Sequence, residues 1–311
     1  MTDATQPRVP TFLVAGAARA GTTGLVEGLR GHPRVFVTDP KEPHYLALHD
    51  TRPDFRGPGD DRLVNSVAVT SEAAYRALFP ADAAATALGE GSVSTLYLHQ
   101  RAIPEIQRLN PDVKIVILLR EPVSRAFSSF QYLRTLGVED QEDFLAAVDL
   151  EPQRIAENWH HLWHYTAMSR YADAVSAFLA QFPPGQVGVW FYDDLQRDYA
   201  DTLRRVLQFL QLPAVAGEGE HVPRVNASGA LRYPAVHKSI WWATRQPALR
   251  HAVRGLSSFR FREAVRAKII TRGDVPEAVR AALDPVFADD LTRLRSLLPG
   301  DVPLWLSNVG T

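Results

Sequence analysis

A short motif near the N-terminus contains the residues best suited to bind phosphate. G-A-A-R-A-G-T-T, residues 16–23, follows the apolar run 12–15 and precedes a stretch with helical spacing up to residue 29. This order predicts a buried strand, a glycine-bounded loop and a helix. Backbone N–H groups at the start of such a helix lack partners within it and carry partial positive charge. The motif therefore predicts a phosphate-binding loop.

The loop departs at one position from the motif that binds nucleoside triphosphates. Its spacing copies G-x-x-x-x-G-K-[ST], but Thr22 replaces the lysine that reaches the terminal phosphates, and the cation is Arg19 inside the loop. Without that lysine, the loop is poorly equipped for a triphosphate with magnesium. A single 5′-phosphate that carries a less charged leaving group still fits, as in sulfuryl transfer.

Three segments together resemble motifs of one enzyme family. The loop resembles the 5′-phosphosulfate loop of the sulfotransferases that use 3′-phosphoadenosine-5′-phosphosulfate (PAPS), in which Lys or Arg precedes x-G-T-T. K-E-P-H, residues 41–44, is similar to K-E-x-H-[FY]-[FL] of the carbohydrate, heparan-sulfate-type members. R-E-P-V-S-R-A-F-S, residues 120–128, resembles the 3′-phosphate motif R-[DNE]-P-x-x-R-x-x-S. The matches run in the family's order from residue 11 to about residue 226, which suggests a soluble, bacterial-like member.

The resemblance implies that Glu42, Arg19 and His44 are the catalytic residues. Glu42 would remove the acceptor proton, with His44 assisting it or orienting the acceptor, since a carboxylate or imidazole suits general-base catalysis. Arg19 would stabilise charge on the leaving phosphate oxygen and on the sulfuryl oxygens. In G-E-G-S-V-S-T-L-Y, residues 89–97, Gly91 stands where some members carry a catalytic lysine. This departure leaves Arg19, with Lys41 as a second candidate, to supply positive charge.

The nucleotide-binding residues follow from the same resemblance. Arg120 and Ser128 match the ligands of the 3′-phosphate, and a guanidinium and a hydroxyl near a helix N-terminus suit a phosphate dianion. A late loop contributes two further contacts to the nucleotide. The residues expected to bind PAPS are Arg19, Ala20, Gly21, Thr22, Thr23, Arg120, Ser128, Arg224 and Asn226.

Apolar runs and helical spacing alternate along the chain and predict an α/β fold. The clearest strand, residues 113–119, is a continuous β-branched run that ends at Arg120, and Pro122 then begins a helix. Arg120 is thus expected at the carboxyl end of a parallel strand, where α/β proteins bind ligands. We expect helices over residues 155–182, 194–210, 236–244 and 276–298. Residues 1–311 are predicted to form a single domain with a central parallel sheet flanked by helices, of the P-loop-NTPase-like sulfotransferase fold, preceded by a flexible segment 1–10.

Composition limits the classes of partner. The 34 Lys and Arg residues balance 35 Asp and Glu residues, so we expect no nucleic-acid partner. The absence of cysteine excludes disulfides and thiolate zinc sites, and no run approaches the length of a membrane-spanning helix. We therefore predict a cytoplasmic protein without a membrane span. His160 and His164 are separated by the spacing of one helical turn, but no third ligand is apparent, so core packing or an acceptor-binding wall is favoured over a metal site.

The sequence thus predicts a PAPS-dependent sulfotransferase without a metal cofactor. Its acceptor is expected to be a hydroxyl, or as a second choice an amine, of a glycan, glycolipid or small natural product, attacked by in-line displacement. One alternative is a P-loop kinase or nucleotide hydrolase with Asp193 as its magnesium ligand. Another is a non-catalytic nucleotide-binding module. Acceptor identity, O- versus N-sulfation and oligomeric state do not follow from the sequence.

Overall fold

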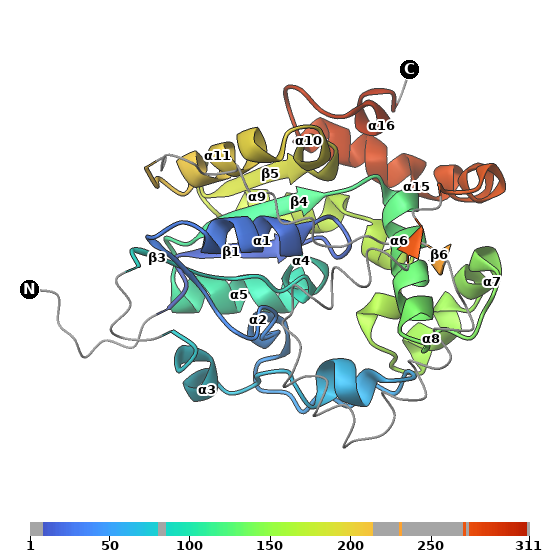
Figure 1. The fold of residues 1–311 in the computed structure, drawn as a ribbon, viewed down its shortest axis with the longest axis horizontal. Coiled ribbons are helices and arrows are strands. Elements are labelled where there is room, and N and C mark those ends of the chain that lie inside the picture. The colour runs from blue at the N-terminus through green and yellow to red at the C-terminus, as the bar shows by residue number, and fades with distance from the viewer. Residues whose placement is uncertain (1–8, 80–84, 214–229, 232–269, 272–273, 310–311) are drawn as a thin grey trace, which may run out of the picture.

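The computed structural model describes residues 9–79, 85–213, 230–231, 270–271 and 274–309. Its centre is a sheet of five parallel strands in the order β2-β3-β1-β4-β5 (Figure 1). The strands are β1 Phe12–Gly16, β2 Val35–Val37, β3 Ala87–Glu90, β4 Lys114–Leu119 and β5 Val187–Phe191. Every residue of β1 is buried, as are five of the six residues of β4. The prediction of a central parallel sheet is confirmed.

Helices cover the sheet, and long connections carry shorter elements. α1 packs against α11, α5 against α9, and α9 in turn contacts α15 near the C-terminus. The longer helices are α1 Thr22–Arg30, α5 His99–Leu109, α6 Pro122–Thr135, α9 Ala172–Gln181, α11 Tyr199–Phe209 and α15 Glu277–Leu297. The shorter elements are α2 Tyr45–Leu48, η1 Asp61–Asn65, α3 Glu72–Arg76, α4 Ser94–Tyr97, α7 Phe144–Asp149, α8 Glu151–Ala156, η2 His161–Trp163, η3 Ala167–Ser169, α10 Tyr192–Arg197, β6 Ala230–Leu231, β7 Ile270–Thr271 and α16 Leu304–Ser307.

The C-terminal helix α15 is tied to the sheet domain by a buried carboxylate. Asp290 on α15 accepts hydrogen bonds from the backbone N–H groups of Tyr171 and Ala172 at 2.8 and 3.2 Å. These donors lie at the start of α9, where the first N–H groups of a helix have no partner within it. α15 thereby caps α9, which explains why the end of the chain returns to the sheet.

The long helix predicted over residues 155–182 is wrong. α8 ends at Ala156, two single turns follow, and α9 begins only at Ala172. Side chains from elsewhere bind the intervening backbone: Asp60 accepts from the N–H of His160 at 2.8 Å, and Glu151 accepts from the N–H groups of Thr166 and Ala167. Such bonds compete with the hydrogen bonds of a helix. The helix predicted over 194–210 is likewise two helices, α10 and α11, because Asp198 caps the second.

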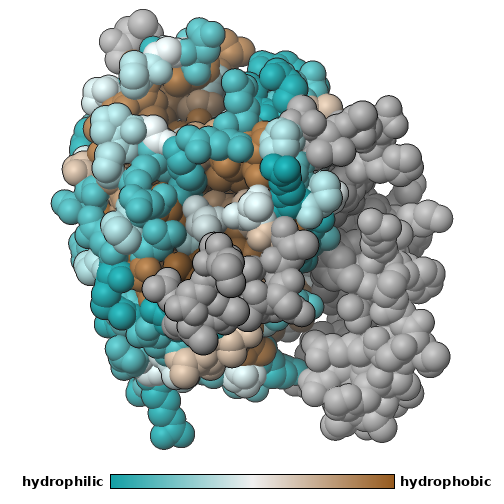
Figure 2. Space-filling view, turned by 90° about the vertical axis from the view of Figure 1, so that its left-hand side faces the viewer, coloured by the Kyte–Doolittle hydropathy of each residue, from teal (hydrophilic) through white to brown (hydrophobic). Residues whose placement is uncertain are grey.

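On the face of the molecule seen in Figure 2, hydrophilic residues cover most of the described surface, and hydrophobic residues show in separate patches. None of the helices that the structure describes combines the length and the apolar character needed to cross a bilayer. The helix predicted over residues 236–244 lies outside the described residues.

Candidate active site

The loop between β1 and α1 occupies the carboxyl end of the central strand. Gly21 precedes α1 with a φ of 90°, a conformation that L side chains rarely adopt. A Cβ atom at this position would also lie 2.8 Å from Cδ2 of Leu195 and 3.0 Å from the ring of Tyr192. The glycine thus lets the loop approach α10 closely and turn directly into the helix, with Thr22 buried at its start. The predicted order of strand, glycine loop and helix is confirmed.

Three of the predicted nucleotide ligands lie together beside this loop. Nε of Arg19 donates to Oγ of Ser128 at 3.3 Å, and Nη1 of Arg120 donates to the carbonyl oxygen of Arg19 at 3.0 Å. The guanidinium of Arg19 lies 4.4 Å from the ring centroid of Tyr132, and that of Arg120 lies 4.6 Å from the ring centroid of Tyr192. Residues from the first loop, the end of β4 and helix α6 therefore converge on one place.

This group concentrates positive charge away from water. Burial, together with the neighbouring positive charges of Arg120 and Arg125, lowers the pKa of the Arg19 guanidinium to about 10, although Tyr132 and Tyr192 act in the opposite direction. Burial also lowers the pKa of Arg120 and of Arg125, which lies on the inner side of α6. Desolvated guanidinium groups that repel one another gain strongly from an anion placed between them. The arrangement is suited to bind phosphate groups.

The N-terminus of α6 contributes less to this anion site than its position suggests. The carboxylate of Glu121 accepts hydrogen bonds from the N–H groups of Val123 and Ser124 at 2.9 and 2.8 Å. Glu121 also pairs with Arg280 of α15 at 3.3 Å. The N–H groups at the start of α6, which the sequence placed near a phosphate, are thus bound by a carboxylate of the protein. Arg120 and Ser128 remain the predicted phosphate ligands at this end.

The predicted catalytic pair Glu42 and His44 lies between β2 and α2. Nζ of Lys41 is 3.0 Å from Oε1 of Glu42 and donates to the carbonyl oxygen of Gly91 at 3.1 Å. His44 has a φ of 60°, and its Nδ1 lies 2.9 Å from Oγ of Ser94. The contacts with Gly91 and Ser94 hold this segment against the residues that follow β3, the strand that pairs with β1. The carboxyl ends of parallel strands share one edge of a sheet, so this segment and the first loop face the same edge.

The protonation states of this pair follow from burial and neighbouring charge. Burial by itself would raise the pKa of Glu42, but Lys41, His44 and a hydrogen bond from the backbone of Val93 hold it below its ordinary value. Burial lowers the pKa of His44, whose residue is only 6% exposed. The Glu42 side chain keeps 31% exposure. At neutral pH the pair therefore presents an ionised, accessible carboxylate beside a buried neutral imidazole.

Several neighbours of the site were not anticipated from the sequence. The ring of Tyr132 lies against the guanidinium of Arg19, and the ring of Tyr192 lies against that of Arg120. Tyr132 could have been found from the sequence, because it follows Ser128 by one helical turn on α6. Glu90, at the end of β3, is 1% exposed, and burial raises its pKa to about 8. Its carboxyl group accepts from Oγ of Ser92 at 2.5 Å, and Ser92 in turn accepts from the N–H of His44 at 3.1 Å.

The remaining predicted residues are placed as follows. His160 contacts the His44 ring, with ring centroids 6.1 Å apart, and His164 contacts the Tyr97 ring, with centroids 5.6 Å apart; burial lowers the pKa of both histidines. Within the described ranges, no three His, Cys, Asp or Glu side chains are grouped so that they could hold a metal ion. Asp193, the magnesium ligand of the kinase alternative, accepts a hydrogen bond from Nε1 of Trp305 at 3.1 Å. Arg224 and Asn226 lie outside the described residues.

Comparisons with known proteins agree with this fold. Residues 10–216 match the model of the Sulfotransferase family. A crystal structure of a sulfotransferase from Alicyclobacillus acidocaldarius superposes with a TM-score of 0.73 at 26% identity, covering 96% of this chain and 99% of that chain. The chain belongs to the sulfotransferase family, and the predicted resemblance is confirmed.

Two relatives of the chain are named as sulfotransferases of heparan sulfate. Heparan sulfate glucosamine 3-O-sulfotransferase 3B1 of Mus musculus is 27% identical over 208 residues, which cover 67% of this chain and 47% of that protein. Bifunctional heparan sulfate N-deacetylase/N-sulfotransferase 3 of Homo sapiens is 26% identical over 239 residues, which cover 75% of this chain and 25% of that protein. The chain thus matches half or less of the length of these relatives.

Proposed function

We propose that this protein transfers the sulfuryl group of PAPS to a hydroxyl group by direct in-line displacement. The observation that carries the proposal is the convergence of Arg19, Arg120 and Ser128 beside a phosphate loop that lacks the triphosphate lysine. PAPS carries one phosphate on the 3′ position of its ribose and another, bonded to the sulfuryl group, on the 5′ position. The loop of residues 19–23 binds the 5′-phosphosulfate, and Arg120 with Ser128 binds the 3′-phosphate.

The reaction forms one bond to sulfur and breaks another. The acceptor oxygen attacks the sulfur atom, the bond between sulfur and the bridging oxygen of the 5′-phosphate breaks, and 3′-phosphoadenosine-5′-phosphate (PAP) leaves with that oxygen negatively charged. Arg19 neutralises charge on the bridging and sulfuryl oxygens as it develops. Glu42 accepts the acceptor proton, because it is the ionised and accessible group of its pair. His44, hydrogen-bonded to Ser94, orients Glu42 or the acceptor.

A glycan is the favoured acceptor class. The relatives named above are sulfotransferases of heparan sulfate, one acting on a hydroxyl of glucosamine and one named for N-sulfation. The K-E-P-H segment matches the carbohydrate-type motif, and Glu42 is suited to remove a hydroxyl proton. A hydroxyl of a glycan is therefore proposed first, with a glycolipid, a small natural product or an amine as further acceptors.

Calorimetric titration with PAP, beside ATP with magnesium, tests the donor. We expect PAP to bind with micromolar affinity or better and ATP with magnesium to bind much more weakly, because the loop offers no lysine to the terminal phosphates. Incubation with PAPS and a panel of glycans, followed by mass spectrometry, then identifies the acceptor by the added sulfuryl mass. Preference for ATP with magnesium over PAP would contradict the proposal and favour the kinase or hydrolase alternative.

A further inference from the structure

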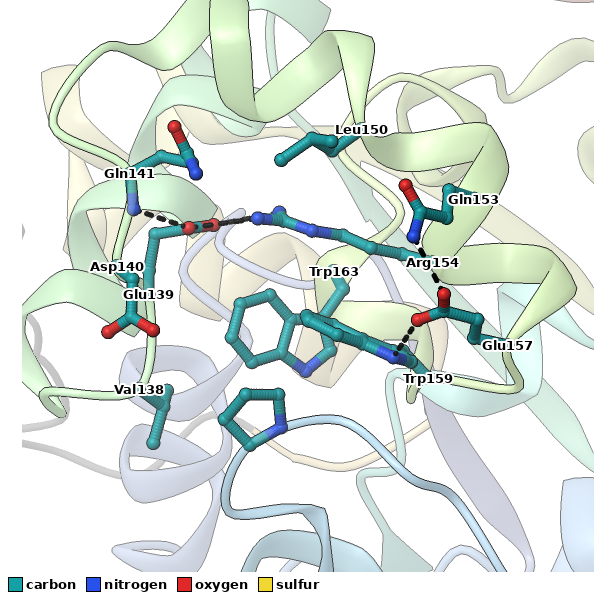
Figure 3. Close-up of a pocket in the computed structure, with 11 residues that line it drawn as sticks. Val138, Glu139, Asp140, Gln141, Leu150, Gln153, Arg154, Glu157, Trp159 and Trp163 are labelled. Carbon is teal, nitrogen blue, oxygen red and sulfur yellow. Dashed lines mark hydrogen bonds and ion pairs between the residues drawn. The ribbon is translucent and has the colours of Figure 1, made fainter.

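A cavity of about 140 Å³ lies away from the residues assigned to PAPS and to Glu42 (Figure 3). It is formed where the segment after α6, the helix α8 and the loop around Pro58 meet. Drug-sized ligands occupy pockets of about 300 Å³ or more, so this cavity suits a single ring rather than an extended molecule. It belongs neither to the loop of residues 19–23 nor to the segment of residues 41–44, and the proposed reaction does not use it.

Two indole rings form one wall of the cavity. Trp163 is 1% exposed, so its ring is held in place by packing, whereas Trp159 is half-buried. The two rings meet edge to face, with centroids 4.8 Å apart. Figure 3 shows both indoles side by side beneath the guanidinium of Arg154. Tryptophan faces carry the negative part of the ring quadrupole and pack favourably against C–H bonds, which are polarised in the opposite sense. The C–H face of a pyranose ring meets this requirement.

The polar groups of the cavity are hydrogen-bonding and predominantly acidic. Glu157 accepts from Nε1 of Trp159 at 3.1 Å and from Nε2 of Gln153 at 2.7 Å, and it remains exposed at the rim. Asp140 is also exposed at the rim. Carboxylates accept up to four hydrogen bonds in total, so each keeps acceptor capacity for hydroxyl groups of a ligand. Carboxylates at the rim repel an anionic ligand.

Arg154 is the one cation among the described residues that line the cavity, and it is already neutralised. Its Nη1 and Nη2 donate to both oxygens of Glu139 at 2.8 and 2.9 Å, and both residues are buried. The guanidinium also lies 5.1 Å from the ring centroids of both tryptophans. An anionic ligand therefore finds no unpaired positive charge among these lining residues.

From this geometry we propose that the cavity binds an uncharged hydroxylated ring, of the pyranose type, through Trp159 and the carboxylate of Glu157. The site is distinct from that of the donor, and its binding does not depend on the proposed sulfuryl transfer. The heparan sulfate named for the relatives is a polyanion, whereas the rim carboxylates of this cavity disfavour an anionic ring. The cavity therefore gives this chain an affinity for neutral glycans.

The segment that carries Trp159 and Trp163 also reaches the candidate active site. Asp60 accepts from the N–H of His160 at 2.8 Å and from Nε1 of Trp163 at 3.2 Å, and so holds both sides of this segment in place. His160 on the same segment contacts His44. The segment that lines the cavity thus also packs against the candidate active site.

Binding of simple sugars tests this inference without any turnover. Methyl glycosides of glucose, galactose and mannose, together with glucose 6-sulfate, are titrated while tryptophan fluorescence and saturation-transfer NMR are recorded. We expect millimolar affinity for at least one neutral glycoside, as befits a single ring, and at least tenfold weaker binding of the sulfated sugar. Trp159→Ala should weaken binding of the neutral glycoside tenfold or more, whereas Ile155→Ala, an exposed position on the neighbouring helix α8, should not change it.

A second variant keeps the test decisive if Trp159→Ala perturbs the fold. Glu157→Gln removes one rim charge and preserves the size of the side chain, so it should reduce the discrimination against glucose 6-sulfate several-fold. The inference is overturned if no neutral glycoside binds, if the sulfated sugar binds more tightly than the neutral one, or if both pocket variants behave like the wild type. PAP titrated into the same samples reports the donor site separately, so its outcome is independent of this one.

Discussion

Replacement of Arg120 tests how the protein distinguishes its nucleotide. Arg120 lies at the end of β4, its guanidinium stacks on Tyr192, and Nη1 donates to the carbonyl oxygen of Arg19. Arg120→Ala removes one charge-assisted bond to the 3′-phosphate, about 1.5–3 kcal/mol, and one neutral bond to the loop, about 0.5–1.5 kcal/mol. The sum of about 2–4.5 kcal/mol corresponds to PAP binding weakened about 30- to 2000-fold.

The assay compares PAP with AMP, which lacks the 3′-phosphate. Calorimetry should show a large loss of PAP affinity in Arg120→Ala and a loss for AMP that is at least tenfold smaller. Arg197→Ala, a neighbouring arginine on α10 whose side chain is 74% exposed, serves as the matched control and should bind both nucleotides like the wild type. Equal losses for PAP and AMP would mean that Arg120 acts only by shaping the loop through Arg19. Unchanged PAP affinity would refute its assignment to the 3′-phosphate.

Three further perturbations separate chemistry, loop geometry and burial. Glu42→Gln should lower turnover by about 10²- to 10⁴-fold, as for loss of a general base, with PAP affinity within twofold of wild type by calorimetry; near-normal turnover would remove Glu42 from that role. Gly21→Ala should reduce the free energy of unfolding by about 1–3 kcal/mol in urea titrations, because φ is 90° and Leu195 lies in the way, and an unchanged midpoint would contradict this strain. Burial lowers the pKa of His164 to about 4, so the unfolded state binds a proton first as the pH falls below about 6.5. Lowering the pH from 7.5 to 5 should therefore reduce stability by about 2 kcal/mol through this residue, and His164→Asn should flatten the pH dependence by that amount.

The sheet was predictable because its strands are buried on both faces. β4 reads as an uninterrupted apolar run and ends where a charged residue and a helix-starting proline follow, so the sequence locates both the strand and Arg120. The loop before α1 was predictable for a similar local reason, because Gly21 has a φ of 90°, which L side chains rarely adopt. These features depend on neighbours in the sequence and need no knowledge of the tertiary structure.

Other features depend on partners that are far away in the sequence. The region after α8 has helical spacing, yet Asp60, about a hundred positions earlier, binds its backbone and prevents a continuous helix. The pairing of Glu121 with Arg280 likewise follows from the docking of α15. In the site, the motifs predicted that Arg19 and Ser128 both bind PAPS, but their direct contact appears only when β1 and β4 pair. Long-range contacts of this kind leave no periodic signal in the sequence.

The departure at Gly91 clarifies what Lys41 does. A Cβ atom at position 91 would lie 3.0 Å from Cγ2 of Val26 and 3.5 Å from Cε of Lys41, so the lysine stem runs directly past this glycine. Its ammonium group is bound to the Gly91 carbonyl oxygen and to Glu42. Lys41 therefore acts first on the base: it keeps the Glu42 carboxylate ionised against a burial effect that favours the neutral acid. In the proposed reaction Glu42 loses its charge as it takes the acceptor proton, so the attraction that holds Lys41 to it weakens as negative charge accumulates on the sulfuryl oxygens. The role that we propose for Lys41 is therefore to keep the base ionised before the reaction, and Arg19 remains the cation proposed to stabilise the leaving oxygen.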